Sequence, residues 1–85
     1  MIQLIIFLDG LKLIAKLEEE PSELGEPDCR IISPFIVKGV DGTTTLEPWL
    51  SDFSKQESFM IHSDKILTIA EPSAKLKGLY EDLTK

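Results

Sequence analysis

The first residues of the chain form an almost continuous apolar run. Residues 2–8 contain one polar side chain, Gln3. A strand with one wet face alternates apolar and polar residues, so this run predicts a strand that is covered on both faces. A terminal helix or a neighbouring subunit would supply the second cover. Asp9-Gly10 then predicts a tight hairpin, because the central positions of a type I′ turn take positive φ and favour such residues.

The residues after this turn alternate and predict a second strand with one apolar face. The apolar positions are Leu11, Leu13, Ala15 and Leu17, and the polar face carries Lys12, Lys16 and Glu18. Ile14 is the exception on the polar face. Like charges and proline at Glu18-Glu19-Glu20-Pro21 end the strand. Residues 20–28 are acidic and rich in Pro and Gly, which predicts either a solvated linker or a loop that faces a ligand or partner.

A third strand is predicted over Cys29–Val40, where β-branched and aromatic residues are frequent. Pro34 within it indicates a bulge or an edge position. Asp41-Gly42 predicts a second tight hairpin. Residues 43–62 fit either one long bulged strand or two strands joined by an extra turn. After the corner His62-Ser63-Asp64, residues 65–70 predict the last strand.

A helix is predicted over about residues 73–84. Pro72 and Ser73 suit its first turn, and its apolar residues recur at helical spacing. These are Leu76, Leu79, Tyr80 and Leu83. The expected fold is therefore mainly β: one domain over residues 1–85, with a small, strongly bent five-stranded antiparallel barrel over about 2–70 and a C-terminal helix.

Size and composition indicate self-association. A chain of 85 residues is marginally stable alone, and with Cys29 as its one cysteine it has no disulfide. His62 is the one histidine, so no metal site and no cofactor are expected. The apolar run at residues 4–8 is far shorter than the roughly 20 residues that span a bilayer, and no signal peptide is recognisable. We expect a cytoplasmic protein without membrane contact.

The charge of the chain limits its partners. With a net charge of −6, it has no general attraction for nucleic acid, so any such site must be a local patch. The sequence has no paired carboxylates in catalytic context, no nucleophile–histidine set and no glycine-rich phosphate loop. We therefore do not expect an enzyme.

Two segments resemble the paired motifs of the Sm-like (LSm) proteins. Asp9-Gly10 followed by Ala15-Lys16-Leu17 resembles the first motif, in which Gly-x-Leu ends the strand. Ile61-His62-Ser63-Asp64-Lys65-Ile66-Leu67-Thr68-Ile69 is similar to the second motif, Ile-Arg-Gly-x-x-Ile-x-x-Ile, with histidine and serine in place of Arg-Gly. Trp49-Leu50 and the tail Ala70-Glu71-Pro72-Ser73 resemble small Sm-like proteins of marine cyanophages, in which the helix follows the barrel. A phage protein would act in the host cytoplasm.

The resemblance implies a nucleic-acid site, with RNA favoured over DNA. In the family, bases enter a pocket lined by the loop after the second strand and by the Arg-Gly corner. Carried over by position, the corner is His62 and Ser63 with Lys65 beside it, and Asp28 and Arg30 are the nearest residues of the loop. Lys12, Lys16 and Lys38, together with Arg30, are candidates for a basic face.

The resemblance also implies a homo-oligomeric ring. In the family, the fourth strand of one subunit pairs with the fifth strand of the next. The corresponding apolar edges have neither proline nor lysine runs to prevent pairing. The candidate interface residues are Phe59, Met60, Ile61, Ile66, Leu67, Ile69 and Trp49.

Several features also have a purely structural interpretation. His62 fits a surface or packed histidine, Cys29 a small core residue, and Trp49 a core or interface residue. The alternative function is a structural or adaptor ring that binds host or phage proteins. It would use the acidic residues 18–28 and the helix, and the negative charge favours it.

Overall fold

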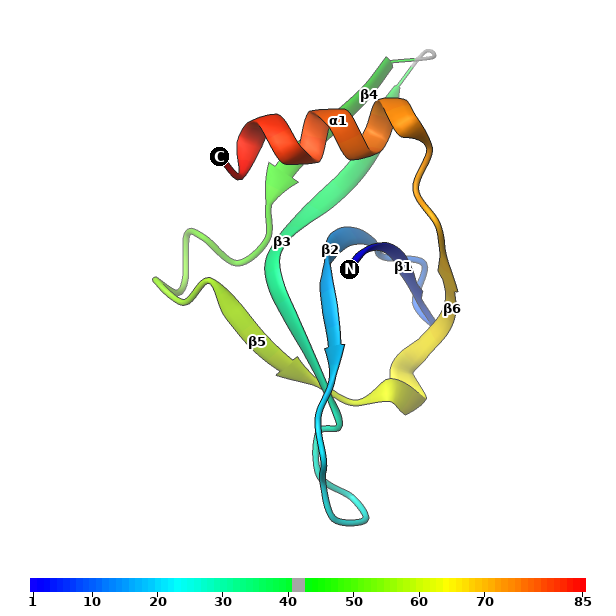
Figure 1. Cartoon of the computed structure of the whole chain (residues 1–85), viewed down its shortest axis with the longest axis vertical. Coiled ribbons are helices and arrows are strands. Elements are labelled where there is room, and N and C mark those ends of the chain that lie inside the picture. Colours follow the sequence, from blue (N-terminus) through cyan, green and yellow to red (C-terminus); the bar gives the residue numbers. More distant parts are fainter. Residues whose placement is uncertain (41–42) are drawn as a thin grey trace.

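The computed structural model describes residues 1–40 and 43–85. The protein is mainly β, with one helix after the last strand (Figure 1). The six strands are β1 (Ile2–Phe7), β2 (Lys12–Glu19), β3 (Cys29–Val40), β4 (Thr43–Pro48), β5 (Ser58–Ile61) and β6 (Ile66–Ala70). A short 3₁₀ turn, Ser63–Lys65, joins β5 to β6, and the helix α1 spans Ala74–Leu83. No helix in the described ranges is long and apolar enough to cross a membrane.

All six strands belong to one antiparallel sheet in the order β4-β3-β2-β1-β6, and β5 also pairs with β3. Between β5 and β6 no pairing is seen in the described part of the chain, so the sheet is not a closed barrel. The predicted mainly β antiparallel fold with a C-terminal helix is confirmed. The predicted five-stranded barrel is corrected to a six-stranded open sheet, because residues 43–62 form two strands that each pair with β3.

The long strand β3 is bent at its centre. Its first part, Cys29–Ile32, pairs with β5, and its second part, Phe35–Val40, pairs with β4 (Figure 1). Between the two parts lie Ser33, whose φ is 51°, and Pro34. The register between β2 and β3 shifts at this point. The bulge expected from Pro34 is therefore confirmed, since proline has no N–H to give to a ladder.

The hairpin between β1 and β2 uses a different turn from the one predicted. The carbonyl of Phe7 accepts a hydrogen bond of 2.9 Å from the N–H of Gly10, whose φ is 92°. The Asp9 carboxylate accepts a hydrogen bond of 3.0 Å from the N–H of Leu11. One left-handed residue after an ordinary turn is typical of a three-residue loop rather than a type I′ turn. The second predicted hairpin turn, Asp41-Gly42, lies outside the described residues.

Two groups of apolar side chains cover opposite faces of β2. On the concave side, Ile5, Leu13, Ala15 and Ile31 are fully buried. On the other side, Ile14 and Tyr80 are fully buried together with Leu76 of α1. The exposed position predicted for Ile14 is therefore wrong, because α1 covers this face. The same helix supplies the second cover expected for β1, whose Ile2 and Leu4 pack beneath it.

Candidate functional site

The corner between β5 and β6 meets the loop that precedes β3. The Asp28 carboxylate accepts two hydrogen bonds from Ser63, one from its N–H at 2.8 Å and one from its hydroxyl at 2.5 Å. The two residues are 35 positions apart in the sequence. The pairing of β3 with β5, in which Cys29 lies opposite Ile61, brings them together. The structure thus places three predicted site residues, Asp28, His62 and Ser63, beside one another.

The carboxylate of Asp28 is held in its ionised form. The hydroxyl and the N–H of Ser63 lower its pKa below the usual 3.8, and the nearby His62 lowers it further. Hydrogen bonds to a charged form favour that form. An ionised carboxylate has about four lone-pair sites, so Asp28 retains acceptor capacity beyond the two bonds from Ser63.

A small hollow of about 150 Å³ opens at this corner. It is lined by Gly25, Glu26, Asp28, His62, Ser63 and Asp64. Sites for drug-sized ligands are usually about 300–1,000 Å³, so this hollow suits one small planar group. Its three carboxylates repel phosphate, and they favour a group that offers N–H donors.

The other two predicted corner residues are placed differently. Arg30 forms an ion pair with Glu20, with 2.8 Å between Nε and Oε1, and both side chains are partly exposed. Its guanidinium is therefore already engaged by a carboxylate of the acidic loop. Lys65 lines a separate hollow of about 320 Å³ together with Phe7, Leu8, Asp9, Leu11 and Trp49.

The four cations proposed as a basic face do not share one face. Lys12 and Lys16 are exposed and alternate with Ile14, so they lie on the side of β2 that α1 covers. Lys38 follows Val37, which packs under α1, so Lys38 lies on the opposite face of β3. Its Nζ is 2.9 Å from a carboxylate oxygen of Glu47.

Apart from Trp49, which follows β4, the predicted interface residues lie on β5 and β6, which are outer strands of the sheet together with β4. Phe59 and Ile61 of β5 and Ile66 of β6 pack partly against the core. Trp49 also packs there, with its ring centroid 5.5 Å from that of Phe59. The exposed members are Met60 at 41%, Leu67 at 64% and Ile69 at 47%.

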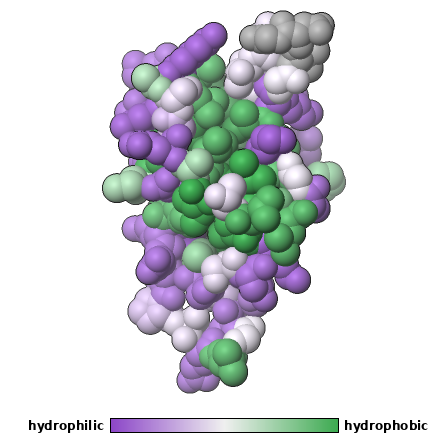
Figure 2. Space-filling view, turned by 90° about the vertical axis from the view of Figure 1, so that its right-hand side faces the viewer, coloured by the Kyte–Doolittle hydropathy of each residue, from purple (hydrophilic) through white to green (hydrophobic). Residues whose placement is uncertain are grey.

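Strands β5 and β6 lie on opposite sides of the molecule (Figure 1). Ile69 pairs with the fully buried Ile5, so it faces the concave side, yet it is exposed at the sheet edge. Figure 2 shows a broad apolar area in the middle of the β6 side. The exposed large apolar residues of β6 are Leu67 and Ile69, and the exposed Leu8 is joined to this edge by a hydrogen bond of 3.0 Å from its N–H to the carbonyl of Lys65. We call these three residues the apolar β6 face.

One exposed aromatic residue has no role in the pattern of the sequence. Phe53, in the segment between β4 and β5, is 87% exposed. A single aromatic residue within the polar segment Ser51–Glu57 was the available signal. In the described ranges there is no group of three or more metal-ligating side chains.

The chain belongs to a protein family of unknown function, DUF6561, whose profile matches residues 1–85. A comparison with curated proteins finds no significant match.

Proposed function

We propose that this member of the DUF6561 family is a non-catalytic subunit of an Sm-like homo-oligomeric ring that binds single-stranded RNA. The proposed binding site is the hollow at Asp28, His62 and Ser63. The observation that carries the proposal is the double hydrogen bond from Ser63 to the Asp28 carboxylate. It joins the loop after the second strand to the corner before the last strand. These are the two segments that line the base pocket in the family that the sequence resembles.

The open sheet supports self-association. Its outer strands β5 and β6 carry exposed apolar side chains, and neither has the proline or lysine residues that usually prevent edge pairing. Because the two edges are different surfaces on opposite sides, a pairing of β5 with β6 of the next copy is head-to-tail (Figure 1). Head-to-tail contacts that close produce a ring.

The chemistry of the hollow supports recognition of a base rather than of the backbone. The ionised Asp28 accepts N–H donors; uracil and guanine each present a ring N–H on the Watson–Crick edge, whereas adenine presents there only its exocyclic amino group. The half-buried His62 offers a ring for stacking, as aromatic side chains do in many proteins that bind single-stranded RNA. The acidic lining keeps phosphates outside. Each site would bind RNA weakly on its own. In a ring, binding at one site raises the effective concentration of the RNA at the others, which raises the overall affinity.

Two measurements on the purified protein test this function. Light scattering is expected to give a mass several times that of the 9.5 kDa chain. Fluorescence anisotropy is expected to detect binding of oligo-U and oligo-G and weaker binding of oligo-A. Added salt is expected to cause little loss of affinity, because the acidic hollow contacts the base rather than the phosphates. DNA oligonucleotides of the same sequences separate RNA binding from general single-strand binding. The absence of binding at micromolar protein would overturn the nucleic-acid proposal.

Site variants make this test specific. His62→Ala and Asp28→Asn are expected to weaken binding without changing the mass of the oligomer. Asp82→Asn makes the same charge change at an exposed position of the C-terminal helix, which does not line the hollow, and serves as the control. Equal effects of Asp28→Asn and Asp82→Asn would show that only net charge matters.

A protein-binding ring is the second candidate. It is favoured by the net charge of −6 and by the ion pairs that occupy Arg30 and Lys38. A larger hollow of about 570 Å³ beside the end of α1 includes Phe35, Trp49 and Leu83 and offers room for a partner side chain. Capture from host lysate with and without nuclease separates the two functions. Partners that survive nuclease, with no bound RNA, would favour the adaptor.

A further inference from the structure

The segment between β4 and β5 loops away from the sheet, although both strands pair with β3. We call residues 50–56 the arm. Just before it, the N–H of Trp49 donates a hydrogen bond of 3.1 Å to the carbonyl of Pro34, and just after it the carbonyl of Glu57 accepts one of 2.6 Å from the N–H of Ser33. The two attachment points are consecutive residues of β3. The arm therefore leaves the sheet and returns at nearly the same place, and pairing with β3 does not require it.

The arm has a defined shape. The carbonyl of Leu50 accepts hydrogen bonds from the N–H groups of Phe53 at 3.0 Å and Ser54 at 2.9 Å. The hydroxyl of Ser54 accepts a hydrogen bond of 3.1 Å from the N–H of Gln56, whose side-chain amide donates one of 3.1 Å to the carbonyl of Ser58.

This shape has an energetic cost in the isolated subunit. Leu50 has a φ of 62°, a left-handed conformation that is unfavourable for any residue with a Cβ atom. The turn also holds Phe53 with 87% of its surface in water. Such strain persists where the surrounding structure imposes it, and it is concentrated at functional positions. An aromatic residue presented to solvent by a strained, hydrogen-bonded turn suggests that another surface covers it.

The position of the arm identifies that surface. The arm leads directly into β5 and lies on the β5 side of the molecule, opposite β6 (Figure 1). In the proposed pairing of β5 with β6 of another copy, that copy lies on the side of the molecule from which the arm leaves the sheet (Figure 1). Phe53 lies five positions before Ser58, the first residue of β5, and so close in sequence to the proposed interface strand.

We propose that the arm is an intersubunit clasp, in which Phe53 packs on the apolar β6 face of the next subunit against Leu8, Leu67 and Ile69. This inference rests on the proposed ring and adds a contact beyond strand pairing. Two exposed apolar surfaces on opposite sides of one molecule would then be buried together, because Phe53 of each subunit would cover the apolar β6 face of the next. Aromatic residues that enter apolar surfaces of a partner commonly dominate the affinity of an interface.

The first test compares two exposed apolar residues in the full chain. Phe53→Ser is expected to weaken ring assembly by roughly tenfold or more, measured as the concentration at which the oligomer dissociates in sedimentation equilibrium. The control Leu24→Ser changes a fully exposed residue at the tip of the loop before β3 and is expected to have no such effect. Neither change touches the core, so circular dichroism of both variants is expected to match that of the native protein.

The second test identifies the contact directly. A benzoylphenylalanine at position 53 is irradiated in a mixture of ¹⁴N- and ¹⁵N-labelled chains, and adducts are mapped by mass spectrometry. Adducts that join the two labels and map to Leu8 or to residues 66–70 support the clasp. Adducts only within one chain, or a Phe53→Ser ring as stable as the Leu24→Ser ring, overturn it while the proposed ring stands. A native protein that stays a single chain overturns both.

Discussion

The hydroxyl of Tyr80 donates a hydrogen bond of 3.0 Å to the carbonyl oxygen of Ile32, the last residue of β3 before its bend. The Tyr80 ring also packs edge-on against Phe35, with 5.8 Å between centroids, on the other side of the bend. One side chain of α1 therefore holds both parts of β3. Burial raises the pKa of Tyr80, so its hydroxyl remains protonated and donates throughout the neutral range.

This relationship predicts the effect of removing a single oxygen atom. Tyr80→Phe is expected to lower the free energy of unfolding by about 0.5–1.5 kcal/mol, because the Ile32 carbonyl loses its side-chain donor. Tyr80→Ala is expected to cost clearly more, since it also removes the buried ring. Urea unfolding measures both at one fixed protein concentration, because the proposed assembly would make the apparent stability depend on concentration. A Tyr80→Phe protein as stable as the native one would show that the hydrogen bond contributes nothing.

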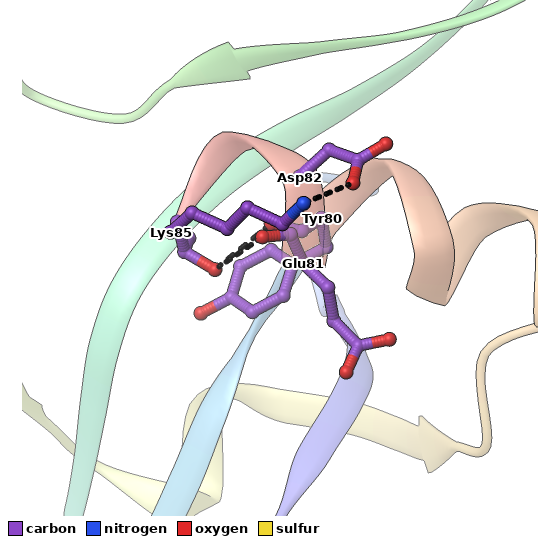
Figure 3. A network of polar contacts seen from close by, with 5 residues as sticks. Tyr80, Glu81, Asp82 and Lys85 are labelled. Carbon is purple, nitrogen blue, oxygen red and sulfur yellow. Dashed lines mark hydrogen bonds and ion pairs between the residues drawn. The ribbon is translucent and has the colours of Figure 1, made fainter.

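The charges of α1 oppose its dipole. Lys75 and Lys77 lie near its N-terminus, while Glu81 and Asp82 lie near its C-terminus. The Asp82 carboxylate is 3.6 Å from Nζ of Lys85, and Figure 3 shows the Glu81 carboxylate pointing away from that pair. Carboxylates are favourable at a helix N-terminus and cations at a C-terminus.

Reversing the charge at the N-terminal end is therefore expected to stabilise the fold. Lys75→Glu should raise the free energy of unfolding by roughly 0.3–1 kcal/mol at low salt, whereas Glu81→Lys should gain little, because it places like charges four residues from Lys77 and from Lys85. Urea unfolding at low salt and at about 1 M salt measures the effect, and the gain should largely disappear at high salt. A loss of stability in both variants would mean that the native charges make favourable contacts elsewhere.

The contribution of Asp28 is expected to depend on pH. Its pKa in the folded protein lies below the usual 3.8, so its hydrogen bonds with Ser63 stabilise the fold fully above that value. This contribution is lost as the pH falls through the lowered pKa. Asp28→Asn should therefore destabilise the protein at pH 7, and the difference from the native protein should shrink below about pH 3.8. Urea midpoints between pH 2.5 and 8 give the curve.

The control for this curve is Ser63→Ala. It removes the hydroxyl donor and keeps the charge of Asp28, so it is expected to show a smaller effect with the same pH dependence. An Asp28→Asn effect that is constant with pH would show that the charge of Asp28 does not stabilise the corner.

Local sequence signals predicted most of the fold. The Asp9-Gly10 hairpin, the Pro34 bulge and the helix after Ser73 each follow from the preferences of a few neighbouring residues. The exposed position predicted for Ile14 failed because strand periodicity does not reveal what covers a face. Its burial depends on α1, which is distant in the sequence. For residues 43–62 the sequence left two alternatives open, one long bulged strand or two strands joined by an extra turn. The structure has the second, and no local pattern decides it because the ends of the arm are fixed by hydrogen bonds to another strand, β3.

The candidate site was predictable only in part. His62 and Ser63 were identified through the resemblance to the second Sm motif, and Asp28 through its place in the loop. Their contact arises from the pairing of β3 with β5, which no local pattern encodes. The ion pairs of Arg30 with Glu20 and of Lys38 with Glu47 likewise depend on loop and strand geometry. Counting cations in the sequence therefore overstated the available basic surface.

The β6 edge provides the most direct test of assembly. Lysine on an exposed strand edge opposes pairing, because a neighbouring strand would have to bury its charge. Leu67→Lys and Ile69→Lys are therefore expected to convert the proposed ring into single chains of about 9.5 kDa in light scattering. Both positions are exposed in the single subunit, so each variant should keep the circular dichroism spectrum of the native protein.

The matched control for the edge variants is Leu24→Lys. It places the same charge at a fully exposed leucine in the loop between β2 and β3, away from both sheet edges, and should leave the ring intact. If Leu67→Lys and Ile69→Lys assemble as the native protein does, the β6 edge is not an interface. If all three variants dissociate, the added charge acts on the whole assembly rather than on strand pairing. Only selective dissociation of the two β6 variants supports pairing of β6 with β5 of the next subunit.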